Sequence, residues 1–164
     1  MTEGLPQVAR VEPGEVTPAL VTALYTGAVV SRVEAGVVSL TGPGAVTALQ
    51  GLLTNDVELP GDGSFVYGAL LTPKGMIVVD GWAARLGATV SYTVPADAGG
   101  RERAHAIFTR SVPPRLARVS DRTADLAVYR LAGPGALAAA VAGGLEVPPA
   151  AGREIGRASC RERV

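Results

Sequence analysis

A strand–turn–helix motif occurs twice in this sequence and limits the folds that the chain can adopt. Residues 40–46 read LTGPGAV, and 91 residues later residues 131–137 read LAGPGAL. Each copy lies between a short apolar run and an Ala-rich stretch with apolar residues at helical spacing. Gly permits a sharp exit from a strand, and Pro suits the first turn of a helix. A duplicated subdomain accounts for the repeat, although local turn chemistry alone could also produce it.

The first copy of the motif leads toward a predicted β-hairpin. The turn Thr72-Pro73-Lys74-Gly75 has Pro at its second position and Gly at its fourth, which is a common β-turn pattern. Because helices and hairpins interleave along the chain, the predicted fold class is α+β. Strands are predicted over residues 37–40, 65–71, 76–84, 89–94, 115–119 and 126–131, and helices over residues 45–53 and 98–110.

The Gly-Pro-Gly of the first copy also raises the question of a phosphate-binding loop. Glycines at a helix N-terminus let backbone amides approach a pyrophosphate. The third Gly of the GxGxxG pattern is absent, since Thr47 occupies its position, and Pro43 has no amide to donate. We therefore interpret Gly42-Pro43-Gly44 as the structural start of a helix.

Composition and charge exclude several classes of function. The 164 residues have a formal net charge of zero and 48% hydrophobic residues, so nothing indicates disorder, a nucleic-acid partner or an anionic-membrane binder. The first residues, MTEGLPQVARVEPGE, lack the basic patch and apolar core of a secretory signal, which predicts a cytoplasmic protein. The longest uncharged run, residues 35–55, is interrupted by glycines and Pro43, so we expect no membrane-spanning segment.

The last residues of the chain differ abruptly from the rest. Residues 154–164 read EIGRASCRERV and hold the only cysteine together with three arginines. The string resembles, in one reading frame and at every position, the translation of a sequencing-adapter run, so we expect this segment to be non-native. Without it the chain has no cysteine, which leaves no disulfide, thiol nucleophile or cysteine metal ligand, and no metal site is predicted.

Asp80 is the residue of most functional interest in the predicted hairpin. As Asp80-Gly81 it could form a two-residue turn, which would leave the carboxylate in water without a function. If the strand instead continues to residue 84, alternation places Asp80 on one face with Met76, Val78 and Trp82. A carboxylate on so apolar a face needs a hydrogen-bond partner, and a ligand amine could serve. Spacing alone leaves both interpretations open.

Four features occur together in this sequence: the strand exit LTGPG at residues 40–44, the helix end LQGLLTND at 49–56, Tyr67, and the hairpin LTPKGMIVVD at 71–80. With them, residues 36–85 resemble the N-terminal region of the glycine-cleavage T-protein and YgfZ family of tetrahydrofolate-binding proteins. The resemblance extends more loosely to about Val141. The family fold has related subdomains around a central folate cavity, which would account for the repeat.

The residues at the end of the hairpin separate the two branches that the resemblance includes, the aminomethyltransferases and the YgfZ proteins. In the family's aminomethyltransferases this hairpin ends in a pair of aspartates, one of which contacts the folate where the methylene unit is transferred. Here only the second position matches, as Asp80, and Val79 stands at the first. A single aspartate is more like the YgfZ branch, whose members are implicated in maintaining iron–sulfur enzymes with help from folate.

The resemblance implies that the chain is the N-terminal fragment of a YgfZ-like protein that binds tetrahydrofolate. Such a protein would be a folate-dependent accessory factor in iron–sulfur protein assembly or maintenance, with iron–sulfur client proteins as partners. Two alternatives stay open. The first is an aminomethyltransferase (T-protein) of the glycine-cleavage system, the one case in which the chain would be an enzyme. The second is a non-catalytic α+β binding module.

The resemblance also implies the site and the domain organisation. Asp80 and Tyr67 would line the pterin side of the folate cavity. Asn55 and Asp56 are further candidates, although a polar pair that closes a helix is commonly a cap or a turn. The expected organisation is an extended lead-in over residues 1–18, a first folate-binding subdomain over 19–123, the start of a truncated second subdomain over 124–153, and the non-native segment 154–164.

Overall fold

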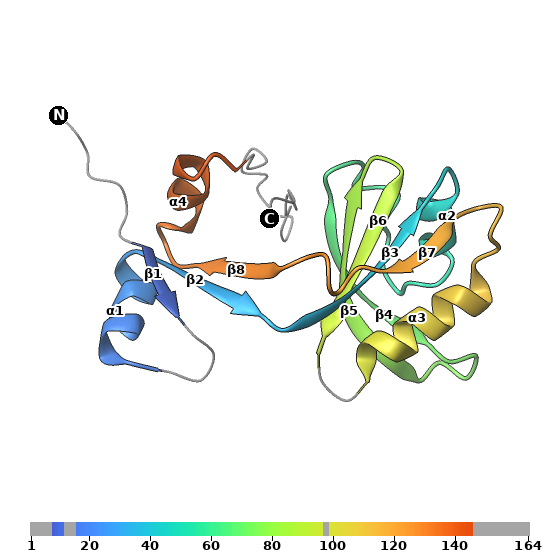
Figure 1. Ribbon diagram of the computed structural model, residues 1–164, viewed down its shortest axis with the longest axis horizontal. Helices are drawn as coiled ribbons and strands as arrows, with labels where there is room; N and C mark the ends of the chain where they lie inside the picture. The colour runs from blue at the N-terminus through green and yellow to red at the C-terminus, as the bar shows by residue number, and fades with distance from the viewer. Residues whose placement is uncertain (1–7, 12–15, 97–98, 146–164) are drawn as a thin grey trace. The chain divides into compact units, whose positions relative to one another are not determined.

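The computed structural model describes residues 8–11, 16–96 and 99–145. Helices and strands interleave along this part of the chain, which confirms the predicted α+β class. The described residues form two compact units. Among the described residues, those within 34–126 make up the larger unit, and residues 8–11, 16–33 and 127–145 make up the smaller one. Each unit contains one sheet and two helices (Figure 1).

The larger unit is built on a five-stranded antiparallel sheet with the strand order β4-β5-β6-β3-β7. The predicted hairpin is present, and its turn at residues 72–75 uses Gly75 with a φ of 80°. The amide of Thr72 donates to the carbonyl of Met76 at 2.8 Å and closes this turn. The elements are β3 (Ala35–Thr41), α2 (Ala45–Gln50), β4 (Phe65–Leu71), β5 (Ile77–Leu86), β6 (Thr89–Pro95), α3 (Gly100–Ser111) and β7 (Arg118–Asp121).

The core of this unit lies between one face of the sheet and the helices α2 and α3. Phe108 of α3 and Tyr92 of β6 are fully buried, and their rings meet edge to face with centroids 5.7 Å apart. Leu49 of α2 and Leu40 of β3 are also fully buried in this cluster. Because successive residues of a strand point to opposite faces, every second side chain of each strand lies on the face of the sheet that α2 and α3 do not cover.

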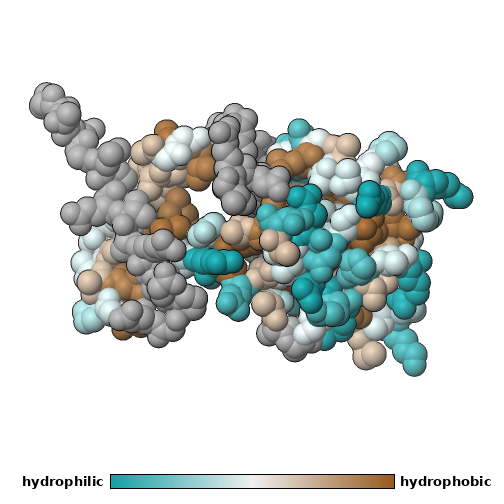
Figure 2. All heavy atoms as spheres, in the orientation of Figure 1, coloured by the Kyte–Doolittle hydropathy of each residue, from teal (hydrophilic) through white to brown (hydrophobic). Residues whose placement is uncertain are grey.

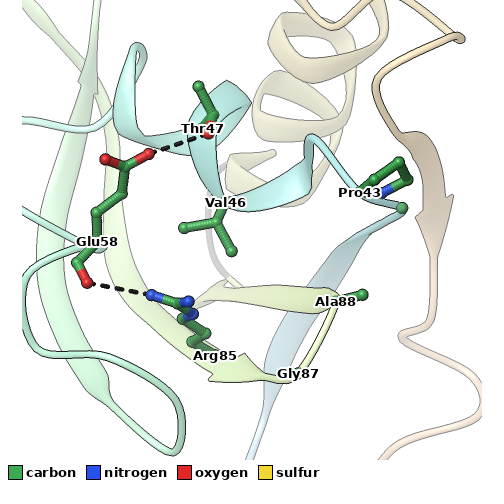
Figure 3. A pocket seen from close by; sticks show the side chains of 8 residues that line it. Pro43, Val46, Thr47, Glu58, Arg85, Gly87 and Ala88 are labelled. Carbon is green, nitrogen blue, oxygen red and sulfur yellow. Dashed lines mark hydrogen bonds between the residues drawn. The ribbon is translucent and has the colours of Figure 1, made fainter.

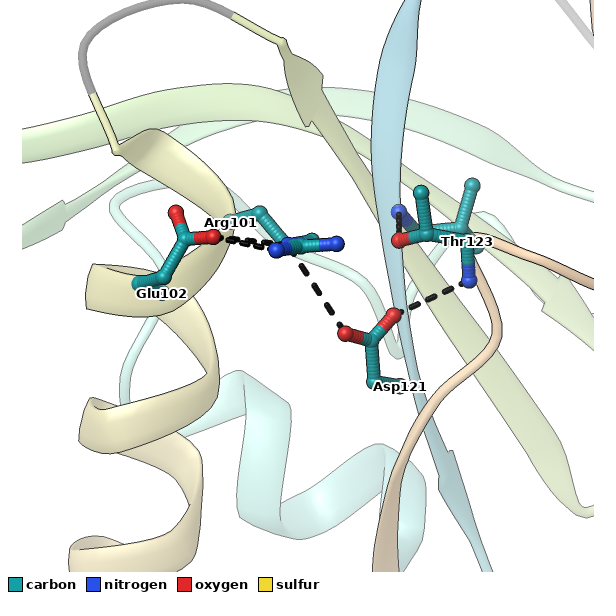
Figure 4. A network of polar contacts seen from close by, with 5 residues as sticks. Arg101, Glu102, Asp121 and Thr123 are labelled. Atoms are coloured by element: carbon teal, nitrogen blue, oxygen red, sulfur yellow. Dashed lines mark hydrogen bonds and ion pairs between the residues drawn. The ribbon is translucent and has the colours of Figure 1, made fainter.

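A polar network ties α3 to β3 and β7 (Figure 4). Arg101, in the first turn of α3, bonds to Glu102, and its Nε lies 3.7 Å from Oδ2 of Asp121. Asp121 accepts the amide of Thr123 at 2.9 Å, and Thr123 Oγ1 accepts the amide of Val37 at 3.0 Å. The bonds from Thr123 are the main reason why the pKa of Asp121 is below its usual value. Because Arg101 and Asp121 are both 41% exposed, their ion pair contributes little to stability.

The smaller unit has a three-stranded sheet in the order β1-β2-β8, with β1 parallel and β8 antiparallel to β2. Thr17 caps α1, because its Oγ1 accepts the amide of Leu20 at 3.2 Å, and Pro18 begins the helix. Neither α1 nor α4 has a buried residue, and apolar surface is visible over this unit in Figure 2. The elements are β1 (Val8–Val11), α1 (Pro18–Thr26), β2 (Ala28–Val33), β8 (Val128–Ala132) and α4 (Ala136–Ala142).

The repeated motif has the same backbone geometry in both units. Gly42 and Gly133 follow β3 and β8 with φ of 143° and 110°, where L side chains are rarely found. The amide of Gly44 donates to the carbonyl of Leu116 at 2.9 Å, and the equivalent amide of Gly135 donates to a carbonyl at 2.7 Å. Since the Gly44 amide is already bonded within the protein, the Gly-Pro-Gly turn starts a helix and does not offer the amide cradle of a phosphate loop.

Strand pairing groups some residues differently from the predicted domain boundaries. The predicted first subdomain includes residues 19–33, but β2 pairs with β8, and these residues belong to the smaller unit. The predicted lead-in, residues 1–18, contains β1 and the first residue of α1. Its remaining residues 1–7 and 12–15, the end of the predicted second subdomain from 146 on, and the predicted adapter segment 154–164 lie outside the described residues.

Candidate functional site

Asp80 lies within a strand and not at a turn. β5 runs through it, and Asp80 pairs with Ala69 of β4. Gly81, unlike Gly75, does not have a positive φ. A Cβ at Gly81 would lie 2.2 Å from the carbonyl oxygen of Thr93, so a close approach of β6 explains the glycine. Of the two interpretations that spacing left open, the continuous strand is confirmed, and the two-residue turn at Asp80-Gly81 is wrong.

Three aromatic side chains share with Asp80 one face of β4 and β5, and we call Phe65, Tyr67 and Trp82 the aromatic face. The rings of Phe65 and Trp82 are stacked, with centroids 4.8 Å apart and 4° between their planes. Tyr67 lies directly opposite Trp82 in the strand register, and their ring centroids are 5.1 Å apart. Tyr67 is 47% exposed. The aromatic face therefore offers a flat or tilted ring surface on which a planar ligand can stack.

Asp80 is joined to the aromatic face by a hydrogen bond that Tyr67 Oη donates to its Oδ2. This bond is the main cause that raises the pKa of Tyr67 above its usual value, and burial and the charge of Asp80 act in the same direction. Tyr67 is therefore a neutral donor at physiological pH. No hydrogen bond from the described residues reaches the other oxygen of Asp80, Oδ1, which can accept an N–H group from a ligand.

The two remaining candidate residues have different places. Asn55 Nδ2 donates to the carbonyl oxygen of Tyr67 at 3.1 Å, so Asn55 supports β4 directly at the aromatic face. Asp56 Oδ1 instead accepts the amides of Glu58 at 2.8 Å and Leu59 at 2.9 Å. Those two bonds are typical of an aspartate that stabilises a turn. The structure thus brings Asn55, Tyr67 and Asp80 together, and it gives Asp56 a role in the turn that follows.

Phe65 and Trp82 are part of this arrangement but were not predicted as site residues. The signal that could have found them is strand alternation. Phe65 precedes Tyr67 by two residues, and Trp82 follows Asp80 by two, so each pair lies on the same face of its strand. Their contact across the strands depends on the register, which sequence spacing alone does not give.

Neither a metal site nor a membrane span is found in the part of the chain that the structure describes. No three His, Cys, Asp or Glu side chains of the described residues come together as potential metal ligands. No described helix is long and apolar enough to cross a membrane.

Comparisons with known proteins find a matching family, a related sequence and a similar solved structure. The family described as the GCVT N-terminal domain matches residues 27–143. An aminomethyltransferase of Rubrobacter xylanophilus is 38% identical over 99 residues, which cover 60% of this chain and 26% of that protein. The crystal structure of the glycine cleavage system aminomethyltransferase T from Bartonella henselae superposes with a TM-score of 0.66 at 22% identity, covering 77% of this chain and 34% of that one.

The extent of these matches determines what they show. The similarity to the Bartonella henselae structure shows a shared fold, since its sequence identity is only 22%. The chain spans about a quarter to a third of the length of these two relatives. The family match covers most of the chain and includes β3 to α3, the hairpin and the aromatic face, and the chain therefore belongs to the GCVT N-terminal domain family.

Proposed function

We propose that the aromatic face and Asp80 form the tetrahydrofolate-binding surface of an aminomethyltransferase. The observation that carries this proposal is the hydrogen bond from Tyr67 to the carboxylate of Asp80, on the same face of the β4–β5 hairpin as the stacked rings of Phe65 and Trp82. A pterin ring is planar and carries N–H donors. It can stack on the aromatic face while Oδ1 of Asp80 accepts a charge-assisted hydrogen bond.

In this proposal each residue has a separate role. Tyr67 holds Oδ2 of Asp80, so the carboxylate is oriented before the ligand arrives. Asp80 then orients or polarises the folate amine during one-carbon transfer. Asn55 positions β4 through the carbonyl of Tyr67, so it acts on the ligand through Tyr67.

Val79 bears on the choice between the two branches of the family that the sequence left open. It is 6% exposed and belongs to the core cluster, whereas Asp80 next to it faces the other side of β5. A carboxylate at position 79 would enter the apolar core and would not reach a ligand beside Asp80. The YgfZ-like iron–sulfur accessory role, with its client proteins, rests on Val79 at the first position of the aspartate pair. Because that position faces the core, the missing carboxylate weighs little against the transferase.

The names of the two relatives also favour the transferase. Both proteins described above are aminomethyltransferases. We therefore place the aminomethyltransferase before the iron–sulfur accessory factor. A non-catalytic α+β module is the outcome to be expected if the aromatic face binds no folate.

Calorimetric titration of the 164-residue chain with 5-formyltetrahydrofolate, an air-stable tetrahydrofolate, tests the proposal. Asp80→Asn removes the charge of the acceptor, which should cost about 1.5–3 kcal/mol, or roughly a 10- to 150-fold loss of affinity. Asp125→Asn is the matched control, because Asp125 is paired with Arg122 at an exposed position. Equal affinities for the wild type and Asp80→Asn would remove Asp80 from the site, and no binding by the wild type would refute the folate proposal.

A further inference from the structure

A cavity lies in the larger unit, and none of the residues that line it belongs to the aromatic face. It has a volume of about 500 Å³ and is bounded by the start of α2 and by the end of β5 with the turn that follows (Figure 3). This volume is within the range of small-molecule sites. Its walls combine two opposite charges with apolar surface: Arg85, Glu58, Thr47, Pro43, Val46 and Ala88.

Arg85 supplies the positive charge of the cavity. Its Nη1 donates to the carbonyl oxygens of Val57 and Glu58, at 3.5 and 3.1 Å, which fixes the guanidinium in place. Nε of Arg85 is buried and has no hydrogen-bond partner among the described residues. No carboxylate of the described residues lies within 4.0 Å of this guanidinium. The charge of Arg85 is therefore not neutralised by an ion pair in the described part of the chain.

Glu58 supplies the negative charge, and its carboxylate is directed elsewhere. Oε1 of Glu58 accepts a hydrogen bond from Thr47 Oγ1 at 3.0 Å. Figure 3 shows the carboxylate turned toward Thr47, while only the main-chain carbonyl of Glu58 meets the guanidinium of Arg85. The nearby carboxylate of Asp62 is likewise engaged, since its Oδ1 accepts the amide of Gly87 at 2.6 Å. One cavity thus presents a cation and an anion that separate hydrogen bonds keep apart.

We infer that this cavity binds a small zwitterion in which a carboxylate and an ammonium are close together, as in an α-amino acid. A carboxylate suits the guanidinium of Arg85, and an ammonium suits the free acceptor capacity of Glu58. A simple anion would meet the charge of Glu58, and a simple amine would meet that of Arg85, so each alone is disfavoured. Pro43, Val46 and Ala88 provide apolar contact for an aliphatic side chain.

The ligand chemistry is tested by amide-resolved NMR titration of the 164-residue chain with L-alanine, L-valine and L-leucine. L-leucine is compared with 4-methylpentanoate, which lacks the ammonium, and with 3-methylbutylamine, which lacks the carboxylate. We expect saturable shifts at the amides of Gly42, Gly87 and Ala88 with L-leucine, and binding weaker by about tenfold with either analogue. No saturable shift with any of the three amino acids, up to their solubility limits, would overturn the inference.

A variant separates the zwitterion site from a plain anion site. Glu58→Gln keeps an oxygen for the bond to Thr47 but removes the charge, so L-leucine should bind about tenfold more weakly while 4-methylpentanoate binds equally or better. Glu102→Gln is the control, because that carboxylate bonds to Arg101 on α3, and it should change neither ligand's affinity. A Glu58→Gln variant that binds L-leucine as the wild type does, or a wild type that binds both ligands equally, would overturn the inference.

Discussion

Replacing Gly81 by alanine should destabilise the larger unit strongly, because the sheet has no room for a side chain there. The added Cβ would lie 2.2 Å from the carbonyl oxygen of Thr93 and 3.1 Å from Cγ1 of Val94. An ordinary contact needs at least about 3.4 Å, so β5 and β6 would have to separate by about 1 Å. The obstructing atom belongs to the backbone and cannot rotate away. Overpacking of this kind costs about 1–3 kcal/mol or more, and we expect the upper end.

Urea denaturation followed by circular dichroism measures this cost, with Gly51→Ala as the matched control. Gly51 follows the last residue of α2 as its C-cap, with a φ of −74°, and the nearest atoms to an added Cβ are carbonyl oxygens at 3.8 Å. That substitution should be neutral or stabilise the protein by about 0.4–1 kcal/mol.

Gly81→Asn separates the strand from a turn at the same position. Asparagine tolerates a positive φ far better than alanine does, so a turn would accept Asn more readily than Ala. In the strand of this structure the larger Asn side chain meets the same carbonyl oxygen, and it should destabilise the protein at least as much as Ala. A stable Gly81→Ala variant, or an Asn variant clearly more stable than the Ala variant, would refute the close approach of β5 and β6.

Three other substitutions probe the core and the repeated motif. Burial is the main reason why the pKa of Tyr92 is raised above its usual value of about 10. The neutral side chain therefore stabilises the folded state below about pH 10, and this stabilisation is lost as the pH rises further. In alkaline urea titrations Tyr92→Phe should reduce that pH slope by up to about 1.4 kcal/mol per pH unit, and an unchanged slope would contradict the burial of Tyr92. Phe108→Ala should lower the free energy of unfolding by about 3–5 kcal/mol in urea denaturation. Leu59→Ala, at an 86% exposed position, should change it by less than about 0.5 kcal/mol, and similar losses for the two variants would contradict the burial of Phe108 in the core. Gly42→Ala combines a positive φ with a Cβ 2.9 Å from the carbonyl oxygen of Leu116, so its thermal midpoint should fall, and an unchanged midpoint would contradict the turn geometry.

The elements that local chemistry determines could be predicted from the sequence. The hairpin around residues 72–75 has its turn residues in the expected order, and β4 begins and ends at the predicted residues. The start of α2 at Gly42-Pro43-Gly44 could also be predicted from local properties, because Pro43 has no amide to donate and glycine is conformationally free. In each case the residues that decide the structure are neighbours in the sequence.

The features that were missed depend on distant parts of the chain. Asp80-Gly81 has the local pattern of a turn, but the glycine is needed because Thr93 approaches it from the neighbouring strand. β2 was not predicted, and its antiparallel partner β8 follows about a hundred residues later. The ring stacking of Phe65 and Trp82 depends on the register of β4 and β5, which no spacing within either strand specifies.

The central claim, that folate binds on the aromatic face beside Asp80, is tested most directly by intermolecular nuclear Overhauser effects. Trp82 is the only tryptophan of the chain, so its indole protons are assigned without ambiguity. In a sample of the chain with 5-formyltetrahydrofolate we predict cross-peaks between the pterin protons and the indole of Trp82, and their loss in Asp80→Asn at the same ligand concentration. Cross-peaks from the pterin to Val46 and Ala88, in the cavity that Arg85 lines, with none to Trp82, would contradict the account.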